Sequence, residues 1–141
     1  MYHLVFPAKY RRKVFSDEVE KTLRRVCLEI EDGYEINFLE IGADKDHVHF
    51  LIQSVPSLSI TRIVTTIKSI TAKAIFRENP EVKKMLWGGN LWTSGYYANT
   101  VGKYNNEQRI REYVKNQGKS YKEIHKGQLK LFEVSLDTPT F

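Results

Sequence analysis

The sequence predicts an α+β domain in which two helices lie on one face of an antiparallel sheet. Segments with the two-residue period of strands alternate with segments of helical period, and 41% of the 141 residues are apolar, enough for a core without disulfides. The chain contains no internal repeat, low-complexity tract or linker-like stretch. We therefore expect residues 1–141 to form a single domain.

The first half of the chain predicts a strand, a helix and two further strands. An apolar run makes residues 2–9 a strand, and Ser16 or Asp17 can cap a helix that continues to about residue 31. Alternating apolar residues predict a second strand over 34–42, and a short connection leads to a third over 46–53. The helix has apolar residues three to four positions apart: Val19, Leu23, Val26 and Ile30.

The second half predicts a long helix, a helical turn, a strand and a last helix. The long helix follows Pro56-Ser57 and ends near Asn79-Pro80, because proline cannot continue a helix. A helical turn over 82–86 and a strand over 92–102 come next. The last helix runs from Asn105 through Gln117 and ends at Gly118.

The order is therefore strand–helix–strand–strand–helix–strand, followed by one more helix. This is the order of a ferredoxin-like, or RRM-like, fold with an added C-terminal helix. Both central helices would cover the same face of the sheet and leave the other face open. RNA-binding proteins, metal chaperones and enzymes all use this fold, so it does not by itself indicate a function.

Charge and composition narrow the partners and the compartment. The net charge of +5 and the pI near 9.3 favour a polyanionic partner only modestly, because many basic proteins bind no nucleic acid. No apolar run is long enough for a membrane span, and no secretory signal is present. The single cysteine, Cys27, lies in an apolar helical stretch and is expected to be buried, which fits the cytoplasm. The first strand begins almost at residue 1, so a few leading residues are expected to be missing.

The triplet His47-Val48-His49 is the most informative pattern in the sequence. Side chains alternate along a strand, so His47 and His49 share one face while Val48 points toward the helices. Two neutral imidazoles on an open face can bind one divalent cation, and Asp46 or Asp44 could orient or supplement them. The pattern also arises by chance as two solvated surface histidines. His3 and His125 are possible further ligands, although His3 is expected to be packed and His125 solvated.

The last predicted helix places Tyr113 and Gln117 four residues apart, on one face. A phenol oxygen could attack there while an amide oxygen completes a metal site. Transfer to tyrosine conserves the phosphodiester bond energy, so rejoining needs no further energy source. The simpler interpretation is an amphipathic helix whose tyrosine is half-buried. Among the eight tyrosines, four others compete for the role: Tyr96, Tyr97, Tyr104 and Tyr121.

Basic residues suggest where a nucleic acid would bind. The compact cluster Lys9, Arg11, Arg12 and Lys13 is the first candidate, and Lys115 on the last helix lies near the proposed nucleophile. On the long helix the candidates are Lys68, Lys73 and Arg77, which could equally form a solvated face. Aromatic residues that could stack on unpaired bases are Trp92, Tyr96 and Tyr97, although the tryptophan could as well belong to the core.

Together these motifs resemble the single-tyrosine transposases of the IS200/IS605 type, within the histidine–hydrophobic–histidine (HUH) endonuclease group. The resemblance covers nearly the whole chain. Its pieces occur in order: Leu4-Val5-Phe6 with Lys9-Tyr10-Arg11-Arg12-Lys13, Leu39-Glu40-Ile41-Gly42 with Asp46-His47-Val48-His49-Phe50-Leu51, Trp87-Gly88-Gly89 to Trp92, Gly95-Tyr96-Tyr97 to Val101-Gly102, and Tyr113-Val114-Lys115-Asn116-Gln117-Gly118. The sequence departs from the family in its short N-terminus and in Ser94, where many relatives have an acidic residue.

The resemblance implies the chemistry and the partners. His47 and His49 would bind Mg²⁺ or Mn²⁺ with Gln117, and Tyr113 would form a 5′-phosphotyrosine and release a 3′-OH. The substrate would be single-stranded DNA with hairpins near insertion-sequence ends. The enzyme would be a homodimer with composite sites, each combining the histidine pair of one subunit with the tyrosine helix of the other.

Two other functions remain compatible with parts of the sequence. A non-catalytic single-stranded nucleic-acid-binding module would keep the basic surface, but it would have no reason to combine His47, His49, Tyr113 and Gln117. A metal-dependent hydrolase would activate water, and it usually needs more carboxylate or histidine ligands than this chain offers.

Overall fold

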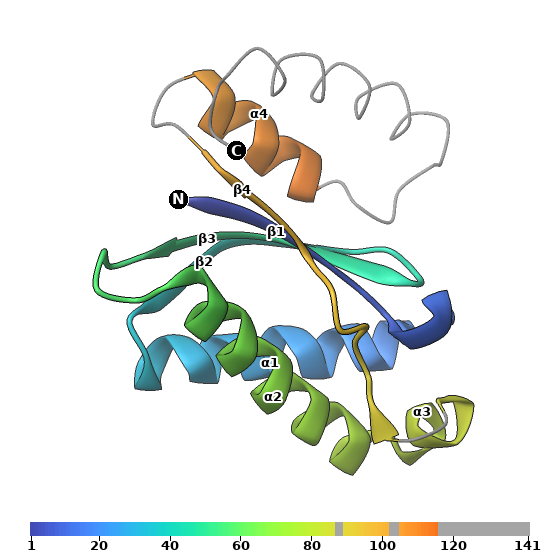
Figure 1. Cartoon of the computed structure of the whole chain (residues 1–141). Coiled ribbons are helices and arrows are strands. Elements are labelled where there is room, and N and C mark those ends of the chain that lie inside the picture. The colour runs from blue at the N-terminus through green and yellow to red at the C-terminus, as the bar shows by residue number, and fades with distance from the viewer. Residues whose placement is uncertain (87–88, 102–104, 116–141) are drawn as a thin grey trace.

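A four-stranded antiparallel sheet with strand order β2-β3-β1-β4 forms the centre of the computed structural model, which describes residues 1–86, 89–101 and 105–115. Helices α1 (Asp17–Gly33) and α2 (Ile60–Glu78) cover one face of the sheet, and α4 (Asn105–Lys115) lies over the other (Figure 1). This strand order confirms the predicted ferredoxin-like fold. The strands are β1 (Tyr2–Pro7), β2 (Ile36–Ala43), β3 (His47–Ser54) and β4 (Tyr97–Thr100).

The helices begin where the sequence provides caps. The hydroxyl of Ser16 accepts a hydrogen bond from the Val19 amide, and the hydroxyl of Ser59 accepts one from the Arg62 amide. Helix α2 ends at Glu78, and Pro80 then opens the short helix α3 (Pro80–Met85), where its missing amide hydrogen costs nothing. In the described part of the chain, no helix combines the length and apolar character that a membrane span requires.

The core lies between the sheet and the two central helices. Val48, Phe50 and Ile52 alternate along β3 and are fully buried in this core, together with Leu23 of α1 and Ile67 of α2. The odd-numbered residues of β3 must then face the other side of the sheet. The periodicity of the sequence therefore predicted correctly which face of this strand packs against the helices.

A β-bulge in β2 changes what the open face of the sheet presents. Phe38 pairs with Ile52 and Glu40 pairs with Leu51, so Leu39 is an extra residue. Phe38 packs in the helix-side core, whereas Leu39 packs with Leu51 on the open face. Two consecutive side chains of β2, Leu39 and Glu40, therefore lie on the open face.

The first and fourth strands are shorter in the structure than predicted. Strand β1 stops at Pro7, and a 3₁₀ turn, η1 (Lys9–Arg11), follows. The fourth strand was predicted over 92–102, but regular pairing begins only at Tyr97; Trp92 makes an isolated bridge with Ala8. The carbonyls of Thr93 and Gly95 accept hydrogen bonds from the side chain of α2 residue Lys68, which explains why this segment leaves the sheet.

Helix α4 packs on the open face of the sheet. Its Val114 is fully buried with Leu51 of β3 and Val101, and Arg111 forms an ion pair with Glu40 at 3.3 Å. The predicted end of this helix at Gln117 and Gly118 lies outside the described residues. The single domain over residues 1–141 stays a prediction for the same reason, since residues 116–141 are not described.

Candidate functional site

His47 and His49 lie side by side on the open face of the sheet, as the strand periodicity predicted. Their ring centroids are 5.1 Å apart, with the two rings at 66° to each other. His49 is 4% exposed, while His47 lies nearer the end of the strand and is partly exposed. Residues 47 and 49 of β3 therefore form a pair of imidazoles in one small region.

Asp46 orients His47. One oxygen of its carboxylate, Oδ1, lies 2.6 Å from His47 Nδ1, and the other, Oδ2, accepts a hydrogen bond of 3.3 Å from Arg11. Burial alone would raise the pKa of Asp46, but the hydrogen bond to His47 and the charge of Arg11 outweigh it and lower the pKa. The ionised carboxylate accepts the Nδ1 proton of His47, so a metal would be bound through Nε2.

His49 has a different neighbour, His3 of β1. The Nε2 atom of His3 lies 2.9 Å from His49 Nδ1, and the two rings are nearly parallel, with centroids 5.2 Å apart. Burial lowers the pKa of His3 to about 4, and burial followed by the two neighbouring histidines lowers the pKa of His49 well below its usual value. Both rings are therefore neutral near pH 7, which is the form of imidazole that binds metals.

The residues present fit part of a metal site. Two imidazoles on one face, each with Nδ1 in a second contact, suit a divalent cation. Within residues 1–86, 89–101 and 105–115, no group of three histidine, cysteine, aspartate or glutamate side chains is placed to hold a metal. A third protein ligand must come from another residue type or from elsewhere, and the predicted one, Gln117, lies outside the described residues.

Tyr113 belongs to α4, and the helix backbone is described although the tyrosine side chain is not. The neighbouring residue Val114 packs on Leu51, which is two residues from His49 on the same strand and the same face. The structure thus brings the helix that carries Tyr113 to the face that carries the histidine pair. Figure 1 shows this helix on the side of the sheet opposite α1 and α2.

The basic cluster begins on the 3₁₀ turn η1, next to this site. Tyr10 and Arg11 have φ angles of 59° and 52°, a left-handed conformation that is rare outside glycine. The amide of Lys9 donates to the Leu91 carbonyl, and Arg11 binds Asp46. The remaining cluster residues, Arg12 and Lys13, are exposed, as is Lys115 of α4. Arg11 therefore connects the basic turn with the residue that orients His47.

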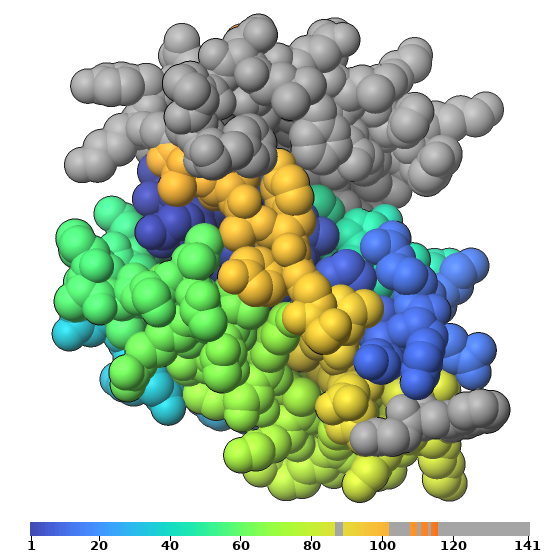
Figure 2. All heavy atoms as spheres, viewed as in Figure 1, coloured from blue at the N-terminus to red at the C-terminus, as the bar shows by residue number. Residues whose placement is uncertain are grey.

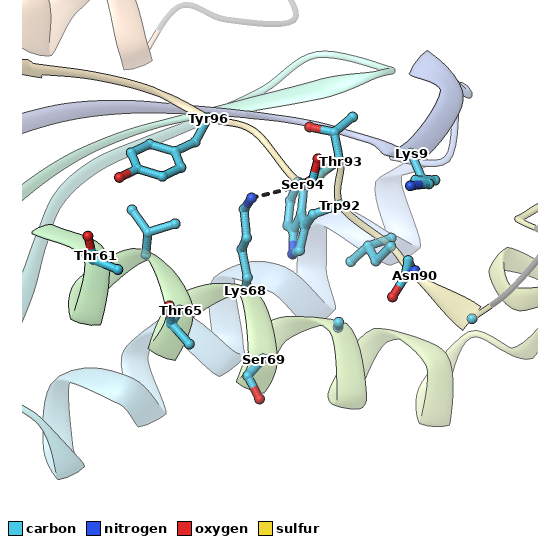
Figure 3. A pocket seen from close by; sticks show the side chains of 14 residues that line it. Lys9, Thr61, Thr65, Lys68, Ser69, Asn90, Trp92, Thr93, Ser94 and Tyr96 are labelled. Atoms are coloured by element: carbon cyan, nitrogen blue, oxygen red, sulfur yellow. Dashed lines mark hydrogen bonds between the residues drawn. The ribbon is translucent and has the colours of Figure 1, made fainter.

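A hollow lies on the helix side of the sheet, between α2 and the segment before β4. It has a volume of about 550 Å³, and its lining includes Lys9, Lys68, Thr65 and Tyr96. Figure 2 shows the segment before β4 crossing the surface between α2 and the N-terminal turn, and Figure 3 shows Lys68 reaching up from α2 toward it. Two cations at this hollow make it a possible contact for phosphates, but Lys68 is already engaged.

Two candidate nucleic-acid contacts are engaged inside the molecule. Lys68 donates hydrogen bonds to the carbonyls of Thr93 and Gly95, at 2.8 and 3.0 Å, so its ammonium group stabilises this segment. Trp92 is only 6% exposed, stacks on Phe15 and donates from its indole to Thr71. It is a core residue and is not available to stack on a base.

The sequence did not indicate how His3 contributes. His3 was expected to be packed, and its exposed fraction of 4% confirms this, but its contact with His49 was not expected. The contact follows from the pairing of β1 with β3. Val5 lies opposite His49 and His3 lies opposite Leu51, so His3 and His49 are diagonal neighbours on one face. That register depends on tertiary packing and cannot be read from one strand alone.

The chain is similar to known transposases. The family model described as "Transposase IS200 like" matches residues 1–117. The ISDra2 transposase TnpA of Deinococcus radiodurans is 35% identical over 118 residues, 82% of each chain. The transposase for insertion sequence element IS200 of Salmonella typhimurium is 28% identical over 116 residues, covering 82% of this chain and 75% of the relative.

Solved structures share the fold. A crystal structure from Deinococcus radiodurans R1 superimposes with a TM-score of 0.66 and 32% identity, covering 84% of this chain and 91% of that one. The structure of a REP-associated tyrosine transposase bound to a REP hairpin has a TM-score of 0.56 at 9% identity, covering 80% and 62%, and so supports the fold alone. With the family model spanning both the histidine pair and Tyr113, this chain belongs to the IS200-like family of transposases.

Proposed function

We propose that this chain cuts and rejoins single-stranded DNA at the ends of an insertion sequence, with Tyr113 as the nucleophile. The observation that carries the proposal is the position of α4, which packs through Val114 on the sheet face that holds His47 and His49. A helix that only completed the core would have no reason to lie beside an oriented imidazole pair.

The reaction is a transesterification. The phenol oxygen of Tyr113 attacks the phosphorus, the Tyr–O–P bond forms, and the bond from phosphorus to the 3′ oxygen breaks. The phenol proton is lost and the departing oxygen gains one, so the products are a 5′-phosphotyrosine and a free 3′-OH. Rejoining is the same step in reverse with a different 3′-OH, and it needs no further energy source.

His47 and His49 are the residues that would hold a Mg²⁺ or Mn²⁺ ion, together with Gln117. When bound, such an ion would polarise a phosphoryl oxygen and stabilise the charge that develops there. Asp46 keeps His47 in the orientation and tautomer that this role requires. The buried environment keeps His49 neutral and therefore able to act as a ligand.

The DNA partner is proposed to be a single strand with hairpins near the cleavage sites. The REP-associated transposase of the same fold was solved with a REP hairpin, and the basic turn of this chain offers Arg12 and Lys13 to phosphates. We propose a homodimer in which the histidine pair of one subunit works with Tyr113 of the other. A non-catalytic binding module and a hydrolase are the alternatives.

The proposal is tested by incubating the full chain with hairpin-containing single-stranded DNA and Mg²⁺ or Mn²⁺. We expect a denaturant-resistant protein–DNA adduct that is absent in Tyr113→Phe and in His47→Ala. Tyr34→Phe is the matched control, because this exposed tyrosine lies just beyond α1. Cleavage by Tyr113→Phe without an adduct would support the hydrolase, and binding without cleavage by the wild type would support the module.

The shared site is tested by mixing inactive variants. A Tyr113→Phe chain and a His49→Ala chain should restore activity in heterodimers, because one of the two composite sites then has both intact parts. Activity that fails to return, although mixed dimers form, would contradict the shared site while leaving the tyrosine chemistry in place.

A further inference from the structure

His3 is buried on the open face of the sheet and contacts one of the two proposed metal ligands directly. It is 4% exposed, its ring is nearly parallel to that of His49 with 18° between the planes, and its Nε2 lies 2.9 Å from His49 Nδ1. A hydrogen bond between two neutral imidazole nitrogens requires that one of them carries the hydrogen and the other accepts it. The direction of this bond decides the tautomer of both rings.

We propose that His3 is a positioning residue that accepts the Nδ1 hydrogen of His49 and thereby keeps the Nε2 lone pair of His49 for the metal. This inference rests on the proposed function of the histidine pair. The contact makes His3 the counterpart of Asp46, which accepts from Nδ1 of His47. Each proposed ligand then has its own acceptor behind it, a carboxylate for one and a neutral imidazole for the other.

The opposite direction is incompatible with metal binding at this pair. If His3 donated from Nε2, His49 would carry its own hydrogen on Nε2, and that nitrogen could not bind a cation. The other ligand has no such ambiguity, because the ionised carboxylate of Asp46 can only accept. The Nε2 atoms of His47 and His49 both keep a lone pair for a metal only when His49 donates its Nδ1 hydrogen to His3.

The use of an imidazole instead of a carboxylate also follows from the location. His3 is the second residue of β1 and is 4% exposed, so an ionised carboxylate at its position would be costly to bury. Asp46 can be ionised because it is a quarter exposed and is paired with Arg11. The buried position of His3 therefore suits a neutral hydrogen-bond acceptor such as imidazole.

The first experiment measures the tautomers in the metal-free protein. In ¹⁵N-labelled full-length chain, long-range proton–nitrogen correlations distinguish protonated from unprotonated ring nitrogens, and single substitutions assign the four histidines. We expect hydrogen on Nδ1 of both His49 and His3. Hydrogen on Nε2 of His49 would overturn the proposal. Because this readout needs neither metal nor DNA, it decides the role of His3 even if the proposed function fails.

The second experiment compares two substitutions of His3 by their Mn²⁺ affinity, measured from the electron paramagnetic resonance of free Mn²⁺. Gln places an oxygen near the position of Nε2 and can accept from His49, whereas Phe keeps the ring and removes the acceptor. We expect His3→Phe to weaken binding by about 10- to 100-fold and His3→Gln to retain most of it. Equal affinities for the folded His3→Phe protein and the wild type would overturn the proposal.

Folding is controlled separately. Circular dichroism and thermal unfolding identify any variant that is not folded, and if His3→Phe fails to fold, the tautomer measurement on the wild type still decides. A wild type that binds no Mn²⁺, with hydrogen on Nδ1 of His49, would support the positioning role of His3 and contradict the proposed metal site.

Discussion

The carboxylate of Asp46 joins two parts of the molecule that the sequence separates by 35 positions: it contacts Nδ1 of His47 with one oxygen and binds Arg11 of the basic turn with the other. A change in the turn that we propose to contact DNA phosphates would therefore reach the proposed metal site through one side chain. The first prediction follows from this contact.

Asp46→Asn should weaken Mn²⁺ binding by about 10- to 100-fold. The neutral amide cannot replace the negative charge of the carboxylate or the way that it orients His47. The measurement is a titration followed by electron paramagnetic resonance. Asp44→Asn is the matched control, since Asp44 lies in the same connection and accepts from the Lys45 amide instead. Equal losses in the two variants would argue against a specific role for Asp46.

The stability of the metal-free protein should fall as the pH drops from about 6.5 toward 4. The pKa of His3 is about 4 in the folded protein and 6.5 in the unfolded chain, so the unfolded chain binds more protons in this window and folding becomes less favourable. The contribution of His3 is about 3 kcal/mol at the acid end, and the lowered pKa of His49 acts in the same direction. Urea unfolding in the presence of a chelator measures it.

The matched variant for this pH dependence is His3→Phe, which removes one of the two buried imidazoles. Its unfolding free energy should depend less steeply on pH than that of the wild type between pH 6.5 and 4. Parallel curves for the two proteins would mean that His3 does not titrate in the way its burial implies.

Lys68→Met should destabilise the protein by about 1–3 kcal/mol, because two carbonyls of the segment before β4 lose a charged donor. Lys73→Met, on an exposed position of the same helix, should change stability by less than about 0.5 kcal/mol. Thermal unfolding compares them. If both variants unfold at the same temperature as the wild type, the contact of Lys68 does not stabilise the segment.

Val114→Ala should loosen α4 more than Arg111→Ala does. Val114 is fully buried, so truncation removes about 1–3 kcal/mol of apolar burial, whereas the partly exposed pair of Arg111 with Glu40 is worth less than about 1 kcal/mol. Amide hydrogen exchange in α4 is the measurement. Faster exchange in the arginine variant than in the valine variant would show that charge, and not packing, holds the helix.

Lys13→Ala and Arg12→Ala should each weaken single-stranded DNA binding and reduce the slope of log K against log salt by about 0.7, the value for one phosphate contact. Fluorescence anisotropy at several salt concentrations measures the slope. Lys21→Ala, on the exposed side of α1, is the control for a general charge effect. A slope that changes equally in all three variants would indicate a diffuse basic surface.

The fold and the histidine pair could be predicted because they depend on local patterns. Strand periodicity shows that Val48 and His49 face opposite sides, and the capping residue Ser16 marks where α1 begins. The extent of β4 could not be predicted in the same way, because the segment that precedes it is held by Lys68, a residue far away in the sequence.

The contacts around the site depend on register. Whether His3 meets His49 is decided by how β1 slides along β3, and a shift of one residue would send it to the opposite face. The basic cluster was predicted, but its attachment to Asp46 through Arg11 was not, because the two residues lie on different loops. The roles of Tyr113 and Gln117 stay predictions.

The bulge at Leu39 has a genetic consequence. Phe38 and Ile41 face the core while Leu39 and Glu40 face α4, so the strand departs from strict alternation by a single residue. Loss of the Leu39 codon would restore that alternation: Phe38, Glu40 and Ile41 would still face their present sides, and α4 would lose one of the apolar residues on which it packs, while Leu51 and Val101 remain. The docking of the helix that carries the proposed nucleophile therefore draws on one extra residue that the pairing of β2 with β3 does not need.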